Sequence, residues 1–353
     1  MSTRTTSTRR GTRARSEGAQ LWSVDDGIER SPLLREGYRR CRELTWRYGT
    51  TYYWGAALLP KARRQHVHAV YALCRLADDI VDDMALFQGE AAAGAPEATT
   101  NAPEATAAAL QAFGDRFRTT LSGRRAGGGL GDDPVMAAVV NTVVSCDIDP
   151  ECFDRFFAAM AMDLTTSTYE TWADLCGHME GSAAVIGEMM LPVLEPSDPA
   201  AKDPARSLGL AFQLTNFLRD VDEDLDRGRV YVPQEDLRRF GVDLSRREAT
   251  PEWKACLAFE IARNRELYRH ADTGIALLPG RSARCVGAAR VLYARILDRI
   301  EAADYDVFSR RVRVPTWRKA ATTGRILVAG PPKRPDQLAA RGRTSDHVTS
   351  DAG

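Results

Sequence analysis

The sequence predicts an all-α fold, and three observations support this prediction. Apolar residues recur at three- and four-residue spacing through most of the chain, as they do in helices that bury one face. Candidate strands are short and few. Hydrophobic residues make up 44% of the 353 positions, enough for a sizeable core. A chain of this length has room for one large or two small domains. We expect a single helical domain over residues 28–320, without an internal repeat.

The predicted helices follow one another along the chain. They cover residues 62–87, 105–121, 134–146, 151–164, 206–228, 252–278 and 282–305. The first contains no glycine or proline, so nothing in its interior breaks the helical pattern. The helix over 252–278 has a recognisable start, because Thr250 is a favourable N-cap residue and Pro251 suits the first helical position.

Three segments lack periodic apolar residues and are predicted to be unstructured. They are an N-terminal tail over residues 1–27, an inserted surface loop at about 89–106, and a C-terminal tail over 321–353. The N-terminal tail is basic and rich in Ser and Thr, but it lacks the apolar centre of a secretion signal. Its composition is compatible with a targeting peptide or with a disordered bacterial tail, and we favour the tail.

Composition excludes several classes of protein. Formal net charge is +0, so no global field attracts nucleic acid or an anionic membrane. The seven cysteines are scattered and odd in number, with no CxxC pair, which favours a reducing, cytoplasmic setting over a disulfide scaffold. No run of eighteen apolar residues predicts a transmembrane segment. Peripheral membrane contact is compatible with the sequence, although no basic amphipathic helix supports it.

A strongly acidic stretch, "FLRDVDEDLDRGRVYVP", covers residues 217–233. In a helix, Asn216, Asp220 and Asp224 are four apart and lie on one face, and Gln213 joins the same stripe. A calcium loop counted from Asp220 requires Gly at its sixth position and Glu at its twelfth. The chain has Leu and Tyr at these positions, so the calcium-loop interpretation fails.

A second acidic stripe lies upstream in "VYALCRLADDIVDD", residues 70–83. Tyr71, Arg75, Asp78 and Asp82 follow one helical face, with Asp79 and Asp83 beside the two carboxylates. The surrounding residues are apolar, so this helix is expected to be largely buried, and buried carboxylates stay ionised only near cations. Two solvated helix faces are the plainer interpretation, but like charges four apart cost a helix about 0.2–0.5 kcal/mol per pair.

If the two acidic stripes face each other, their oxygen ligands suit Mg²⁺, which typically combines a few carboxylates with substrate phosphates. The interleaved arginines, Arg75 and Arg219, suit the remaining phosphate oxygens. Together the two stripes therefore favour a metal site that binds a diphosphate.

With these motifs in place, the chain resembles the squalene/phytoene synthase family of head-to-head trans-prenyl transferases. The resemblance covers roughly residues 51–311 and rests on three segments: "TYYWGAALLPKARRQHVHAVYALCRLADDIVDD", "TYETWADLCGHMEGSAAVIGEMMLPVL" and "LAFQLTNFLRDVDEDLDRGRVYVPQEDL". The last, a Q-L-x-N-x-x-R-D-x-x-E-D signature followed by R-G-R-x-Y-x-P, is highly specific. The amino-acid sequences of these segments are most similar to those of bacterial phytoene synthases.

The resemblance implies an isoprenoid synthase-type helical bundle around a central apolar cavity, with Mg²⁺, or Mn²⁺ in its place, and two prenyl diphosphates. The implied metal ligands are Asp78, Asp82, Asn216, Asp220 and Asp224. The implied diphosphate-binding residues are Thr51, Arg75, Gln213, Asn216, Arg219 and Arg310, the last with Arg311 as an alternative. The four aspartates are also implied in catalysis, together with Tyr71 and Tyr293.

The expected reaction is the condensation of two geranylgeranyl diphosphates to phytoene through a cyclopropyl diphosphate, without NADPH. Next-step carotenoid enzymes are candidate partners. Three alternatives remain: a synthase that uses farnesyl diphosphate to make dehydrosqualene or presqualene diphosphate, a squalene synthase, and a non-catalytic scaffold of the same fold. Both acidic motifs are intact, which argues against the scaffold.

Several other residues are candidates either for the site or for ordinary packing in the core. "GSAAVIGEMMLPVL" and the two phenylalanines Phe212 and Phe217 suit an apolar tunnel wall, although Met189 and Met190 are individually expected in the core. His178 stands where family members commonly have a tyrosine, so the role of that tyrosine is either transferred to His178 or moved elsewhere. The remaining candidates, His66, His68 and His270, are expected at the surface rather than at a metal.

Overall fold

The computed structural model describes residues 31–91 and 102–309, with the side chains of residues 82–103 also outside the description. The predicted tails over 1–27 and 321–353 therefore lie outside the described residues. The all-α prediction is confirmed, since the extended structure of the described part is limited to one isolated parallel bridge, Thr168 with Val230.

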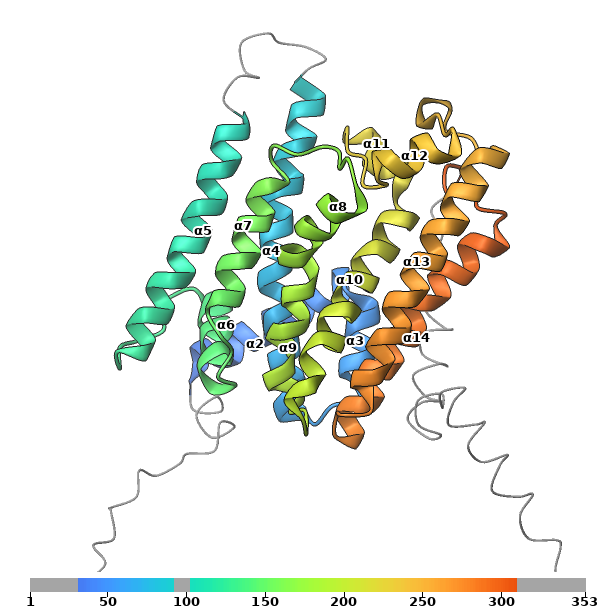
Figure 1. The fold of residues 1–353 in the computed structure, drawn as a ribbon. Helices are drawn as coiled ribbons and strands as arrows, with labels where there is room; N and C mark the ends of the chain where they lie inside the picture. Colours follow the sequence, from blue (N-terminus) through green and yellow to red (C-terminus); the bar gives the residue numbers. More distant parts are fainter. Residues whose placement is uncertain (1–30, 92–101, 310–353) are drawn as a thin grey trace, which may run out of the picture.

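The helices follow one another with short connections (Figure 1). The N-terminal half contains α2 (Pro32–Tyr48), α3 (Thr50–Ala56), α4 (Lys61–Ala91), α5 (Ala102–Arg125), α6 (Pro134–Ser145) and α7 (Glu151–Met162). The centre contains α8 (Trp172–Met179), a π-helical turn η1 (Glu180–Ala184), α9 (Val185–Leu194) and the short 3₁₀ helix η2 (Pro199–Ala201). The C-terminal part contains α10 (Lys202–Arg219), α11 (Val221–Asp226), α12 (Gln234–Phe240), η3 (Leu244–Arg246), α13 (Pro251–Ile275) and α14 (Gly280–Ala302).

Several helices begin at a polar cap followed by proline. The Thr250 side chain accepts a hydrogen bond from the Trp253 amide at 3.3 Å, with Pro251 in the first turn, so the predicted start of α13 is confirmed. The same pattern begins α2, where Ser31 caps the Leu34 amide. The sequence analysis missed α2 and α3, although Ser31-Pro32 carries this start signal.

Two predicted boundaries are corrected. Both ends of the expected loop at 89–106 are helical, because α4 continues to Ala91 and α5 begins at Ala102; residues 92–101 lie outside the described part. The expected single helix over 206–228 is interrupted at Asp220, whose backbone (φ −103°, ψ 18°) separates α10 from α11. Backbone hydrogen bonds still join Asp220 to Asn216 and Asp224 to Asp220, each at 2.9 Å, so the two helices stay in register.

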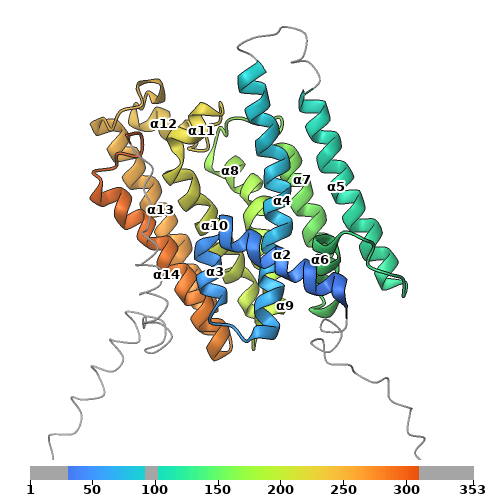
Figure 2. The same ribbon diagram turned by 180° about the vertical axis from the view of Figure 1, so that it is seen from behind.

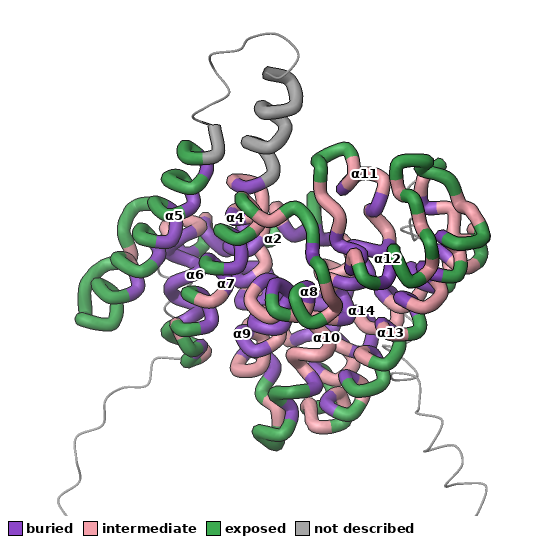
Figure 3. Tube along the Cα trace, turned by 45° about the horizontal axis from the view of Figure 1, so that its top comes forward, coloured by how far each residue is buried: buried purple, intermediate pink, exposed green. Residues whose placement is uncertain are grey.

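Figures 1 and 2 show α4, α9 and α10 in the middle of the molecule, α5 to α7 on one side, and α13 with α14 on the other. One buried apolar cluster is built mainly from α2 and α4 to α7, and a second mainly from α10, α13 and α14. Figure 3 shows the buried residues along the inward faces of these helices, with the outer turns of α5, α11 and α12 exposed. The central cavity described below lies where the two clusters meet.

Helices α9 and α10 approach so closely that only glycine fits at two contacts. A Cβ atom on Gly187 would lie 2.3 Å from the Ala205 carbonyl oxygen, and one on Gly209 would lie 2.2 Å from that of Ala183. At this wall, backbone therefore packs directly against backbone. Among the described helices, none combines the length and apolar character needed to cross a bilayer.

Candidate active site

A large apolar cavity runs through the centre of the bundle. It encloses about 1020 Å³, part of which is open to solvent. Its walls come from α3, η1 with α9, α10, α13 and α14, and its lining is almost entirely apolar. The lining residues on α10 include Phe212 and Gln213. We refer to the end of the cavity at Gln213 as its upper, or polar, end. Such a cavity suits a long hydrocarbon ligand with a polar group at one end.

Four aromatic side chains gather at the upper end of this cavity. Tyr52 of α3 lies 5.5 Å from Tyr71, 6.1 Å from Phe212 and 5.6 Å from Tyr293, measured between ring centroids. Phe212 and Tyr293 stack at 4.3 Å. This aromatic group connects α4, α3, α10 and α14, so it brings the helices of both acidic motifs to one place.

Tyr293 connects the aromatic group to the second acidic motif. Its side chain forms hydrogen bonds with the Tyr52 hydroxyl and with Asn216. Burial raises the pKa of Tyr293, and its neighbours Arg219 and Asp220 lie close enough to act on it in opposite directions. Tyr293 is therefore a neutral hydrogen-bonding group at the junction of cavity and motif.

Tyr71 makes the corresponding connection to the first motif. Burial, followed by Tyr293, raises the pKa of Tyr71, and Asp78 acts in the same direction while Arg75 opposes it. The structure therefore brings Asp78 and Asn216 with Asp220 to the same end of the cavity, with Tyr71 and Tyr293 between them. This convergence is the arrangement that the two stripes suggested.

The arginines of both motifs pair with aspartates. The Arg75 guanidinium contacts Asp79 and lies 4.6 Å from the centre of the Tyr48 ring. Burial tends to lower the pKa of Arg75, but Asp79 raises it overall. Arg219 binds Asp220 through two hydrogen bonds, of 2.6 and 2.5 Å, and its pKa is likewise raised against the effect of burial. Each cation is thereby held at the polar end of the cavity.

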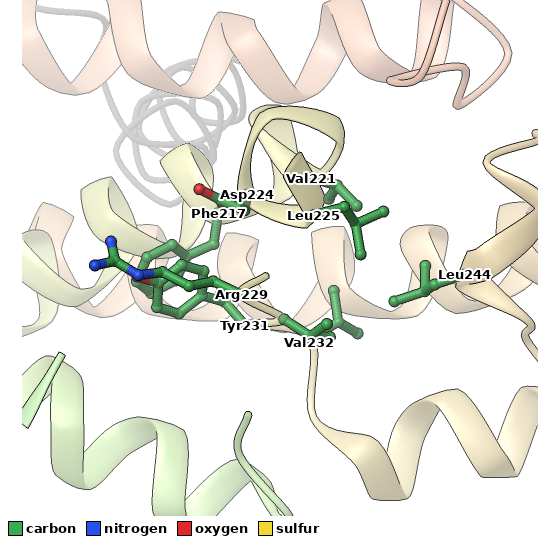
Figure 4. A pocket seen from close by; sticks show the side chains of 9 residues that line it. Phe217, Val221, Asp224, Leu225, Arg229, Tyr231, Val232 and Leu244 are labelled. Atoms are coloured by element: carbon green, nitrogen blue, oxygen red, sulfur yellow. The ribbon is translucent and has the colours of Figure 1, made fainter. Parts of the chain in front are cut away.

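Asp224 follows Asp220 by one helical turn and lies in a small hollow formed by α11 and the following segment (Figure 4). Its side chain is 11% exposed and lies 4.0 Å from the Arg227 guanidinium. Arg229 and the stacked pair of Phe217 and Tyr231, with ring centroids 3.7 Å apart, line the same hollow. Phe217 thus supports the second motif, whereas Phe212 lines the cavity.

The remaining predicted site residues are Thr51, Asp82, Gln213 and Arg310. Gln213 lines the cavity, and Thr51 is half-buried on α3, beside Tyr52. Asp82 belongs to α4, but its side chain lies outside the described part, as does the whole of Arg310.

Comparison with known proteins agrees with this geometry. The family described as squalene/phytoene synthase matches residues 46–318, which span all of the segments just described. The chain belongs to the squalene/phytoene synthase family. Its relatives include the 15-cis-phytoene synthase of Synechococcus elongatus, which is 36% identical over 81% of this chain and 91% of the relative. The chloroplastic phytoene synthase of Daucus carota is 34% identical over 84% of this chain and 71% of the relative.

Solved structures of the squalene/phytoene synthase family have the same fold. Squalene synthase HpnC from Alicyclobacillus acidocaldarius is similar with a TM-score of 0.65 and 28% identity, over 79% of this chain and 98% of that one. A dehydrosqualene synthase in complex with ligand gives a TM-score of 0.69 and 26% identity, over 83% of this chain and 96% of that one. The isoprenoid synthase-type bundle expected from the sequence is therefore confirmed.

Tyr52 is a site residue of this squalene/phytoene synthase that the sequence analysis missed. It contacts both motif tyrosines and lines the cavity. The signal was present, since Tyr52 follows Thr51 in the quoted "TYYWGAALLP", but nothing in the local pattern shows which of two adjacent tyrosines faces inward. Met190 also lines the cavity and corrects the expectation of core packing, whereas Met189 is fully buried as predicted.

His178, where the resemblance led us to expect a tyrosine, is buried and does not line the cavity. It packs between Tyr169 and Tyr231, at ring-centroid distances of 5.2 and 6.2 Å, and its Nε2 lies 3.4 Å from an Asp163 oxygen. Burial lowers its pKa to about 4, so the ring is neutral. His178 therefore supports the segment beneath Asp224 in this structure.

The prediction that His66 and His68 lie at the surface is wrong. Both are buried, and burial lowers the pKa of each to about 4. His66 forms a hydrogen bond of 2.9 Å with the Thr142 hydroxyl, and His68 stacks on Tyr53 at 5.5 Å. The polar groups that satisfy His66 come from helices distant in sequence, so periodicity could not reveal them. His270 is exposed, as expected.

Proposed function

We propose that the chain is a phytoene synthase, a prenyltransferase that condenses two geranylgeranyl diphosphates head to head in carotenoid biosynthesis. The observation that carries the proposal is the junction at Tyr293, where two acidic motifs meet above a large apolar cavity. The similarity to cyanobacterial and plant phytoene synthases over most of the chain supports this member of the family.

The donor atoms at the polar end fit Mg²⁺, with Mn²⁺ as an alternative. Asp78, Asn216, Asp220 and Asp224 supply oxygen, the ligand type that Mg²⁺ prefers. No three His, Cys, Asp or Glu residues of the described part lie close enough to hold a metal alone. In proteins, Mg²⁺ commonly completes its coordination with water and substrate phosphates. We propose the four residues above and Asp82 as its ligands; when bound, Mg²⁺ would stabilise negative charge on the departing diphosphate.

The remaining polar residues are proposed to hold the two diphosphates. Arg75 and Arg219 offer guanidinium donors, which match phosphate oxygens in geometry and charge. Thr51, Gln213 and Arg310 are proposed as further contacts. Tyr71 and Tyr293 are proposed to donate hydrogen bonds from neutral hydroxyls at the boundary between diphosphate and prenyl chain.

The apolar cavity has a chemical task in this proposal. Loss of diphosphate from an allylic substrate generates a carbocation, which the double bond of the second substrate attacks; loss of a proton then closes the ring of a cyclopropyl diphosphate. Departure of the second diphosphate, opening of the ring by rearrangement and loss of a second proton give phytoene, without NADPH. Water would quench either cation, so the reaction requires a dry chamber. The aromatic rings of Tyr52 and Phe212 line that chamber, and Tyr293 stacks on Phe212, so aromatic faces lie where charge would develop.

The proposed setting is the cytoplasm, because all seven cysteines are free thiols in the structure. Peripheral contact with a membrane and with the next carotenoid enzyme is proposed from the chemistry of the product, which is a hydrocarbon that water does not dissolve.

A product assay tests the proposal. Purified protein receives Mg²⁺ and either geranylgeranyl or farnesyl diphosphate, without NADPH, and the extracted products are separated by chain length. We expect a C40 hydrocarbon from geranylgeranyl diphosphate. A C30 product from farnesyl diphosphate alone would assign the chain to the squalene branch, to which the solved structures belong. No product from either substrate, with ligand binding that EDTA does not weaken, would indicate a scaffold.

A further inference from the structure

The depth of the cavity can be measured along its walls. Asn216 marks the diphosphate end, and Pro204 lines the cavity twelve positions earlier on the same helix. At 1.5 Å per residue these levels are separated by about 18 Å. The cavity continues past Pro204, since Ala201 and, on the facing wall, Leu194 also line it.

An extended carbon chain advances roughly 1.25 Å per bond, given C–C bonds of about 1.5 Å. The fifteen main-chain bonds of a geranylgeranyl group therefore span about 19 Å, and the eleven of a farnesyl group about 14 Å. Measured from Asn216, a farnesyl tail ends near the level of Ser207, whereas a geranylgeranyl tail reaches Pro204. The two substrates differ by about one helical turn of cavity depth.

Contacts between helices identify the residues around the part of the cavity that only the longer prenyl chain reaches. Gly187 packs on Ala205, and Gly274 packs on Pro204, whose Cβ would lie 2.5 Å from a Cβ on the glycine. Met190 follows Gly187 by one turn of α9 and lines the cavity. We call Gly187, Met190, Pro204, Ala205 and Gly274 the fourth-isoprene layer. Two of its five members are glycines that let α10 approach α9 and α13 closely, and Ala205 is the small side chain on α10 that lines the cavity.

The walls of this layer cannot readily move outward. The backbone contacts of Gly187 with Ala205 and of Gly209 with Ala183 hold α9 against α10. Side chains added to the layer must therefore extend into the cavity rather than displace a helix. Ala205 is half-buried and lines the cavity from α10, so a larger side chain there would occupy the space of the last isoprene unit.

We propose that the fourth-isoprene layer, with Ala205 at its centre, determines that the enzyme accepts a C20 rather than only a C15 prenyl chain. The inference rests on the proposed function and adds a specificity-determining position to it. Because the last isoprene unit occupies this layer, filling the layer excludes geranylgeranyl diphosphate while leaving room for farnesyl diphosphate.

The test is a competition assay with equal concentrations of the two diphosphates and Mg²⁺, in which C40 and C30 products are measured. For Ala205→Phe we expect the ratio of C40 to C30 products to fall at least tenfold relative to wild type. Ala200→Phe, the same change at an exposed position just before α10, is the matched control and should leave the ratio unchanged. Met190→Trp fills the layer from α9 and should shift the ratio in the same direction.

Circular dichroism and thermal melting establish that each variant is folded, and Ala205→Leu replaces any large variant that is not. Folded Ala205 and Met190 variants with a ratio within twofold of wild type would overturn the inference while leaving the proposed function intact. An equal loss of both products would also overturn it. Wild-type protein that makes C30 but no C40 product would instead refute the proposed function.

Discussion

Two buried glutamates of this protein have opposite protonation behaviour. Glu188 of α9 has a side chain 7% exposed, and Glu260 of α13 has one 0% exposed. Burial tends to raise the pKa of Glu188, but Arg155, Lys202 and Arg206 together lower it to about 2. Burial raises the pKa of Glu260 to about 8, because its one cation, Arg263, is shared with Asp236. Deeper burial, the neighbouring Asp236 and the smaller number of nearby cations together raise the pKa of Glu260, whereas three cations outweigh burial at Glu188.

The same comparison explains what the polar end of the cavity requires. Arg75 and Arg219 each pair with a neighbouring aspartate, Asp79 and Asp220. The sequence supplies five carboxylates between Asp220 and Asp226 alone, and four more in "ADDIVDD". Around Glu188 the protein provides the cations itself, whereas at this end we propose that Mg²⁺ provides them.

The largest effect is expected from removing a proposed metal ligand. Asp220→Ala should lower Mg²⁺-dependent product formation by roughly 10³-fold, about 4 kcal/mol of transition-state stabilisation, because the diphosphate loses charge compensation. Steady-state kinetics over a range of Mg²⁺ concentrations measure the loss. Asp226→Ala, an exposed carboxylate of the same segment, is the control. Near-normal turnover by folded Asp220→Ala would remove this residue from the proposed metal site.

Removing Glu188 should lower stability rather than activity. Glu188→Ala leaves Arg155 and Arg206 with Glu180 as their shared carboxylate and removes the carboxylate that pairs with Lys202, which should decrease the free energy of unfolding by about 2 kcal/mol. Denaturant unfolding measures the change, and Glu170→Ala, which breaks an exposed pair with Arg238, should cost much less. A Glu188→Ala protein as stable as wild type would contradict the structural role assigned to its cations.

Because of Glu260, the free energy of unfolding should fall as the pH rises. A carboxylate that pairs with a cation has the opposite effect. Its pKa is raised in the folded state, so its favourable contribution is complete below about 4.5 and is lost as the pH rises through about 8. The slope is at most about 1.4 kcal/mol per pH unit. Glu260→Gln should be less sensitive to pH over this window in thermal melts. Identical pH profiles for variant and wild type would show that Glu260 ionises normally.

The smallest effect is expected from a hydrogen bond that involves no charge. Tyr52→Phe keeps the ring in the aromatic group but loses the bond to Tyr293, so turnover should fall about fivefold, since a neutral hydrogen bond contributes about 1 kcal/mol. Initial rates with geranylgeranyl diphosphate measure this. Tyr53→Phe, at a ring that packs on Trp46 and His68 and does not line the cavity, should change the rate less. An equal effect of both substitutions would argue against a specific role for Tyr52.

Much of this protein was determined by local sequence. Helix periodicity predicted α4 to α7, α10, α13 and α14, and Thr250-Pro251 predicted where α13 begins. Two motifs were identified from residues spaced four apart: Asp78 with Asp82, and Asn216 with Asp220. Residues at this spacing share a helical face whatever surrounds the helix. The resemblance then connected these motifs to a reaction.

Only the tertiary structure decided which residues meet across helices. The inward position of Tyr52, the burial of His66 and the depth of the cavity all depend on contacts between segments far apart in the chain. Periodicity indicates that a face is buried, but it does not say against what. Glu188 and Glu260 illustrate the reason, because each is a glutamate within a helix, and the cations around it set its charge.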